Sequence, residues 1–274
     1  MKKNILLTIA YDGSEFHGWQ KQPGEVTVQG YLETTMSRLF KQEIALSGTS
    51  RTDAGVHALD QKASFISDIS VPIEKLPLVI NNALCGEEKG SFAKAPIRIL
   101  SAREMSDDFH ARFDCKGKEY IYKIKAGCGS NGDMESPQIG LSQVFDRNYV
   151  YHVSETLEAK AMQEATKYLL GEHDFKSFEA SGGNPGETTV RTIFDAQVFA
   201  SEAAMGTTQN IEIHISGDGF LYNMVRIIAG TLIEIGQGKR QPVDMERIIE
   251  AADRQKAGFT APPYGLYLAE VYYE

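Results

Sequence analysis

Cysteine, apolar runs and cofactor motifs are scarce in this chain. Only three of the 274 residues are cysteines, and their spacings of 30 and 13 residues fit neither a metal site nor a disulfide framework. No apolar run approaches the roughly 20 residues that span a bilayer, and the apolar stretch after Lys2 and Lys3 is too short for a signal peptide. A phosphate-binding glycine loop and a dinucleotide fingerprint are also missing from the sequence. We therefore expect a soluble protein of the reducing cytoplasm, with no membrane, metal or nucleotide cofactor.

Basic residues are also fewer than acidic ones. Lysine and arginine total 28 against 37 acidic residues, a net charge of −9. Taken alone, this balance argues against nucleic-acid binding, which needs basic surface. Residues 112–125 nevertheless hold five basic side chains and two acidic ones. Two interpretations stay open, a basic cleft on an acidic body and a solvated strand face with scattered lysines.

The chain does contain 42% hydrophobic residues, enough for one large or two ordinary domains. Apolar periodicity predicts a first α+β unit over residues 1–104. Thr27 can cap its first helix. The expected elements of this unit are a strand at 4–11, a helix at 27–42, strands at 43–47 and 61–67, a helix at 72–84 and a strand at 97–102.

A second α+β unit is expected over residues 105–274. Ser154 and Gly171 are the predicted cap and stop of its first helix. A cleft between the two units would be the default place for a site. The expected elements are strands at 119–126, 190–200, 209–216 and 266–273 and helices at 154–170, 220–235 and 242–253, with loops at 127–141, 181–188 and 201–208.

A charged run separates the predicted strands at 43–47 and 61–67. It contains Arg51-Thr52-Asp53-Ala54-Gly55-Val56-His57 and is expected to form a structured loop at a strand end, where functional groups are often displayed. Asp53 can serve as a nucleophile and Arg51 as its charge partner, because residues two apart in extended backbone point the same way. The plainer alternatives are an Asp53 that bonds its own loop backbone and an exposed ion pair of little energetic value.

This run resembles the catalytic motif of the tRNA pseudouridine synthase A family of pseudouridine synthases. Five further blocks agree with that family in order and spacing, although Ser50 stands where the family commonly has glycine. The blocks are Tyr11 to Gln20, Phe109 to Tyr122, Gly171 to Phe178, Gly219 to Arg226 and Gly265 to Leu268. The resemblance therefore covers nearly the whole chain.

The resemblance implies an α+β pseudouridine synthase fold. In this fold, two similar α/β units with mixed, mostly antiparallel sheets and flanking helices enclose an active-site cleft. It also implies a homodimer that isomerises uridine to pseudouridine in the tRNA anticodon stem-loop, at positions 38–40. The reaction needs no cofactor, and the base must leave its stack. Two alternatives stay open, the same chemistry on another RNA and an RNA-binding protein that has lost the chemistry.

The family also assigns roles to individual residues. Asp53 would be the catalytic carboxylate, acting at the sugar C1′ or by taking a sugar proton, with support from Arg51. Tyr120 would stack on the flipped uracil, and Arg226 would pair with Asp53 or lie near the base. The structural alternatives are a core aromatic for Tyr120, as expected for Tyr122, and an ordinary buried ion pair for Arg226.

Further residues are predicted to bind substrate. Leu268 would form an apolar wall of the uracil pocket, although core packing explains it equally well. His57 either contacts RNA or only orients the loop. The candidate phosphate contacts are Lys62, Arg112, Lys116, Arg191, Lys239 and Arg240.

Overall fold

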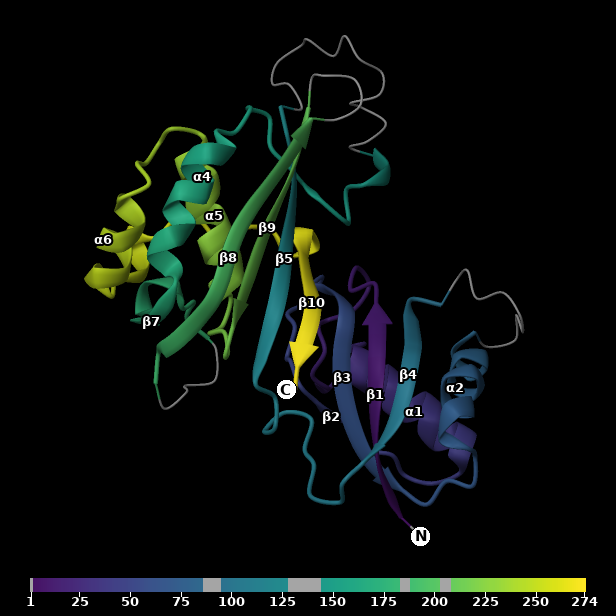
Figure 1. Ribbon diagram of the computed structural model, residues 1–274. Coiled ribbons are helices and arrows are strands. Elements are labelled where there is room, and N and C mark those ends of the chain that lie inside the picture. Colours follow the sequence, from purple (N-terminus) through teal and green to yellow (C-terminus); the bar gives the residue numbers. More distant parts are fainter. Residues whose placement is uncertain (1, 86–94, 128–143, 183–187, 203–207) are drawn as a thin grey trace. The chain divides into compact units, whose positions relative to one another are not determined.

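The computed structural model describes residues 2–85, 95–127, 144–182, 188–202 and 208–274 (Figure 1). The chain divides into two compact units, one of Met1–Lys116 with Tyr267–Glu274 and one of Gly117–Leu266. The boundary expected from the sequence lay after residue 104, and the expected second unit included the last strand. No helix in the described part of the chain has both the length and the apolar character to cross a membrane.

The first unit is built on a sheet in the order β4-β1-β3-β10. Strand β1 (Lys3–Tyr11) pairs antiparallel with β3 (His57–Ser67) and with β4 (Ile97–Met105). The short β2 (Ser47–Gly48) also pairs antiparallel with β3. Strand β10 (Leu266–Tyr272) runs parallel to β3, which places the end of the chain in this unit.

Two helices accompany this sheet. Helix α1 (Val28–Phe40) begins at the predicted cap, where the Thr27 side chain accepts a hydrogen bond from the Gly30 N–H. It passes behind β1 and β4 in Figure 1, and α2 (Leu76–Leu84) lies beside it. Leu32 and Met36 of α1 are fully buried, as the predicted helical face requires. Burial of each such side chain contributes about 1.5–3 kcal/mol.

The second unit is also built on a sheet, in the order β5-β9-β8-β7. Its strands β5 (Gly117–Ala126), β9 (Gln209–Gly217), β8 (Val190–Glu202) and β7 (Gly171–Asp174) pair antiparallel in turn. The short β6 (Tyr151–His152) runs parallel to β5. The sheets of both units are thus mixed and mostly antiparallel, as expected.

Helices α4 (Ala159–Thr166), α5 (Met224–Gly236) and α6 (Asp244–Ala251) lie to one side of the second sheet (Figure 1). Helix α5 is buried along nearly its whole length, and Gly230 allows this because a Cβ there would lie 1.9 Å from the Phe259 carbonyl oxygen. Short 3₁₀ turns complete the described elements at Ile73–Lys75, Lys167–Leu169, Lys176–Phe178, Arg254–Lys256 and Pro263–Gly265.

Two local predictions were wrong. Ser154 does not cap a helix, because α4 begins only at Ala159. Bonds to distant residues hold the segment before it instead. The Leu157 N–H donates to the Gln209 side chain, and the Glu158 N–H donates to the Gly236 carbonyl. Residues 43–46 form no strand, and pairing with β3 begins at Ser47. Most of the predicted loops at 127–141, 181–188 and 201–208 lies outside the described residues.

Candidate active site

The charged run forms the connection between β2 and β3 in the first unit. Pairing of the two strands ends with Gly48 opposite Ala63 and a Thr49 N–H bond to the Lys62 carbonyl (2.9 Å). The chain then leaves the sheet, and a turn closes where the Val56 N–H bonds the Asp53 carbonyl (3.1 Å). The predicted loop at a strand end is therefore confirmed.

The N-terminal loop holds the backbone on both sides of Asp53. The Trp19 N–H bonds the Thr52 carbonyl (3.0 Å), and the Gly55 N–H bonds the Phe16 carbonyl (3.2 Å). The Tyr11 and Thr52 hydroxyls lie 2.6 Å apart and share a buried hydrogen bond. Two blocks distant in sequence thus form one rigid structure around Asp53.

Two glycines make this close approach possible. A Cβ at Gly13 would lie 2.0 Å from the Val56 carbonyl oxygen, and one at Gly18 would lie 2.6 Å from the Thr52 oxygen. Gly18 also has φ +80°, a conformation that favours glycine. Larger residues at either position would push the N-terminal loop off the charged run.

His57 is buried, with 2% of its surface exposed, and it stacks on Tyr267 of β10 at 4.7 Å. Its Nδ1 accepts a hydrogen bond from the Gly13 N–H (3.1 Å) and lies 3.3 Å from Asp12 Oδ1. A backbone N–H can only donate, so Nδ1 is the acceptor of the Gly13 bond and cannot at the same time donate to Asp12. This arrangement favours the orienting role over RNA contact.

Arg51 and Asp53 do not pair as expected. Arg51 is exposed, and it forms no ion pair within the described part of the chain, whereas Asp53 is half-buried and has other interactions. The expectation rested on backbone spacing alone, and residues 51–53 belong to no strand whose pairing would hold the two side chains on one side. Arg51 therefore presents its guanidinium group outward.

The other first-unit candidates differ in accessibility. Lys62 is mostly buried and bonds Asp60 (2.5 Å) and Thr8 (3.0 Å), so its charge is already engaged. Arg112 is exposed in a turn before β5. Leu268 is fully buried on β10 beside Ala58, which fits a packing role.

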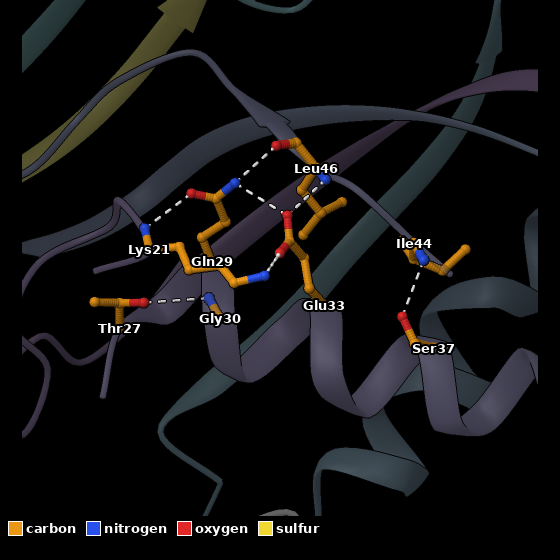
Figure 2. A network of polar contacts seen from close by, with 8 residues as sticks. All are labelled: Lys21, Thr27, Gln29, Gly30, Glu33, Ser37, Ile44 and Leu46. Atoms are coloured by element: carbon orange, nitrogen blue, oxygen red, sulfur yellow. Dashed lines mark hydrogen bonds and ion pairs between the residues drawn. The ribbon is translucent and has the colours of Figure 1, made fainter. Parts of the chain in front are cut away.

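A network on α1 fixes the chain that leads into the charged run (Figure 2). Glu33 is 8% exposed, and its carboxylate accepts hydrogen bonds from the Leu46 N–H (2.9 Å) and the Gln29 side chain (3.0 Å). The Gln29 side chain also donates to the Leu46 carbonyl (3.0 Å), and Lys21 lies 3.2 Å from Glu33. Both backbone groups of Leu46 are thus held by α1.

Tyr120 and Tyr122 lie on the buried side of β5 in the second unit. Tyr120 is 9% exposed and packs edge-on against Phe220 at 5.2 Å. Tyr122 is fully buried and donates to the Pro262 carbonyl (2.9 Å), which confirms it as a core residue. Burial, with Tyr264 and Tyr151 adding to it, raises the pKa of Tyr122 well above its usual value, so this hydroxyl stays protonated.

Arg226 lies on α5 and is half-buried. Its Nε donates to the Ala261 carbonyl (2.7 Å), and Nη1 donates to the Asn223 side chain. The Ala261 N–H in turn donates a hydrogen bond to the Arg226 carbonyl (3.1 Å). These bonds orient the guanidinium group and tie the start of α5 to the segment before β10.

A basic hollow in the second unit contains two of the predicted phosphate contacts, Lys239 and Arg240. Its volume is about 700 Å³, and Arg247 and Lys256 also line it. Arg240 pairs with Glu234 and Arg247 pairs with Asp244, so four cations face two carboxylates. The Gln241 N–H bond and Arg247 hold the pKa of Asp244 below its usual value. The hollow keeps a local excess of positive charge.

No group of three histidine, cysteine or acidic side chains in the described residues is arranged to hold a metal ion. Two buried polar residues near the motif, Glu33 and Gln61, were not expected from the sequence. The strand period places Gln61 on the same side as Ala63 and Phe65, so its burial could have been predicted. Glu33 lies off the apolar face of its helix, and no local signal indicates its burial.

Comparison with known proteins identifies the family. The model of the tRNA pseudouridine synthase family matches residues 7–114 and 165–274, well over half of the chain. A tRNA pseudouridine synthase A 2 of Clostridium tetani is 44% identical over the full length of both chains. A tRNA pseudouridine synthase A of Caldicellulosiruptor bescii is 43% identical, over 99% of this chain and 100% of its own.

These matches, together with the α+β units and the motif loop, show that the chain belongs to the tRNA pseudouridine synthase family of isomerases. A solved structure described as an unknown protein from Galdieria sulphuraria covers 87% of this chain and 94% of its own. Its sequence identity to this chain is 12%, and the TM-score is 0.20.

Proposed function

We propose that this enzyme converts uridine to pseudouridine at positions 38–40 of the tRNA anticodon stem-loop. The observation that carries the proposal is Asp53, a half-buried carboxylate in a loop whose backbone is fixed on both sides. Relatives that are 43–44% identical over essentially the whole chain carry the name tRNA pseudouridine synthase A. Because its substrate is tRNA, we place the enzyme in the cytoplasm.

The reaction requires the N1–C1′ bond of the uridine to break, the base to turn, and a C5–C1′ bond to form. The C5 proton leaves and N1 gains one, so atoms and electrons balance without a cofactor. Asp53 supplies the carboxylate, whether by attacking C1′ or by taking a sugar proton. A rigid loop suits this task because positioning of the reacting group lowers the barrier.

The remaining site residues have supporting roles in the proposal. Arg51 is exposed and can enter the gap left by the flipped base. Tyr120 stacks on the uracil ring, and the bonds that orient Arg226 hold a positive charge ready for the carboxylate or the base. His57 orients the loop, and Leu268 packs behind it.

Phosphate contacts are proposed for Arg112 and the basic hollow, because exposed cations meet the RNA backbone. The family resemblance supports a homodimer, and light scattering of the purified protein will measure its mass. One chain is 30.3 kDa, so a single species of that mass would contradict the dimer.

Modification mapping of RNA from cells that lack the gene tests the function. We expect unmodified uridine at tRNA positions 38–40 and recovery when the wild-type gene returns. Unchanged pseudouridine at these positions would contradict the proposed function. Pseudouridine lost from another RNA instead would favour the alternative substrate, so the mapping covers all cellular RNA.

A further inference from the structure

Gln61 occupies an interior position of β3 in the first unit. It pairs in register with Ile9 of β1 and is fully buried. The interior positions that follow it on β3 include Ala63 and Phe65, so an amide here is an exception. A buried amide must find partners for its donor and its acceptor.

Both partners of this amide belong to one residue, Ser50. The Gln61 Nε2 donates to the Ser50 carbonyl (2.7 Å), and the Gln61 Oε1 accepts from the Ser50 N–H (3.1 Å). The register of β2 and β3 sets Ser47 opposite Ser64 and Gly48 opposite Ala63. The same register would set Ser50 opposite Gln61. The side chain therefore replaces the backbone ladder where the chain leaves the sheet.

Ser50 directly precedes Arg51, and Asp53 follows three residues later. On the other side of Arg51, Thr52 is held by Tyr11 and Trp19. The segment that displays Arg51 and Asp53 is thus fixed at both ends, and Gln61 forms the fixed end nearer to β2. A shift of about 1 Å in such a segment can cost a hundredfold in rate.

We propose that Gln61 is a positioning residue for catalysis, which sets the direction in which the chain carries Arg51 and Asp53 out of the sheet. This inference rests on the proposed function of Asp53. Gln61 touches no reacting atom, and its two bonds to Ser50 carry its effect. Loss of the amide lowers the rate of the chemical step and leaves the binding of tRNA as it was.

The chemistry of the amide gives a specific test. A protonated glutamic acid at position 61 can donate one hydrogen bond and accept another, as the amide does. The ionised form can only accept, so its second oxygen is repelled by the Ser50 carbonyl oxygen. Leucine has neither. Gln61→Glu should therefore recover activity as pH falls, and Gln61→Leu should not.

Other titrating groups lie on the buried side of the elements around Gln61. These are His57 on β3, Tyr11 at the end of β1, Tyr267 on β10 and Glu33 on α1. Asp60 and Lys62 are its chain neighbours and pair with each other. The wild type contains all of these groups, so the ratio of variant to wild-type rate isolates position 61.

The experiment measures kcat and KM for tRNA with purified enzyme from about pH 5.5 to about pH 8.5, the range in which a buried carboxyl group titrates. We expect Gln61→Leu to lower kcat roughly tenfold to a hundredfold at every pH, with KM unchanged. The rate of Gln61→Glu relative to wild type should rise several-fold as pH falls. A flat ratio for Gln61→Glu, or wild-type kcat in a folded Gln61→Leu variant, would overturn the proposal.

A matched control lies in the same unit. The Asn81 side chain also donates to and accepts from one backbone residue, Ile99, with both bonds at 2.8 Å. Asn81→Leu loses the same two kinds of hydrogen bond at a site far along the chain from the motif. It should lower the melting temperature without lowering kcat. Equal losses of kcat in both leucine variants would assign Gln61 a structural role only. Activity that survives in Asp53→Asn would instead refute the proposed function.

Discussion

At the scale of single residues, the Ser50 hydroxyl lowers the stability of the folded state. This hydroxyl is buried and has no hydrogen-bond partner among the residues that the structure describes. A buried unpaired hydroxyl costs about 1–3 kcal/mol. We predict that Ser50→Ala raises the free energy of unfolding by about 1 kcal/mol, because the alanine removes this group and keeps the backbone bonds to Gln61.

Denaturant unfolding of the two proteins measures this difference. The matched control is Ser64→Ala, because the buried Ser64 hydroxyl accepts a bond from the Ala111 N–H (3.2 Å). That variant should lose stability by about 1 kcal/mol. If Ser50→Ala is destabilised as much as Ser64→Ala, the Ser50 hydroxyl has a partner in solution.

Residue identities in the motif could be predicted from the sequence, but their contacts could not. The motif and its family singled out Asp53, Tyr120 and Arg226 without a structure. The expected ion pair between Arg51 and Asp53 is absent because residues 51–53 lie in no strand, so spacing alone did not fix where the two side chains point. Gln61 was missed because its partner depends on the register of β2 and β3.

At the scale of elements, α1 acts through Glu33 on the chain that enters the motif (Figure 2). We predict that Glu33→Ala lowers the free energy of unfolding by roughly 2–3 kcal/mol, because the buried Leu46 N–H loses its partner. Lys21→Ala should cost less than about 1 kcal/mol, since the Lys21 side chain is 65% exposed and only its ion pair is lost. Denaturant unfolding separates the two values, and equal losses would show that the ion pair, not the Leu46 bond, stabilises the network.

Apolar periodicity predicted the helices and strands correctly wherever an element buries only one face. Strand β5 alternates as expected, and Thr27 caps α1 as predicted. The predictions at Ser154 and at residues 43–46 failed for a common reason. In both segments, bonds to distant residues such as Gln209 and Glu33 replace the local pattern, and a local pattern cannot reveal them.

At the scale of the whole molecule, a chain of net charge −9 must still bind RNA. The basic hollow offers Lys239 and Lys256 beside two arginines that are already paired. We predict that Lys239→Ala combined with Lys256→Ala weakens tRNA affinity roughly threefold to tenfold and makes the dependence of log K on log salt shallower by about 1–2.

Filter binding at several salt concentrations measures both quantities. Lys160→Ala is the control, because Lys160 is exposed on α4 among acidic neighbours, and it should change neither. The turnover number at saturating tRNA should stay at the wild-type value in the double variant. If the dependence of log K on log salt is unchanged in that variant, the basic hollow does not bind RNA.

In the proposed function, Asp53 performs the chemistry from a loop whose backbone is fixed on both sides. Asp53→Asn is the sharpest test of this role, because the two side chains have the same size and only the carboxylate is lost. In a single-turnover assay with purified tRNA, we predict no pseudouridine above background, with tRNA affinity and melting temperature close to wild type. Pseudouridine formation at the wild-type rate by the folded variant would rule out Asp53 as the catalytic carboxylate.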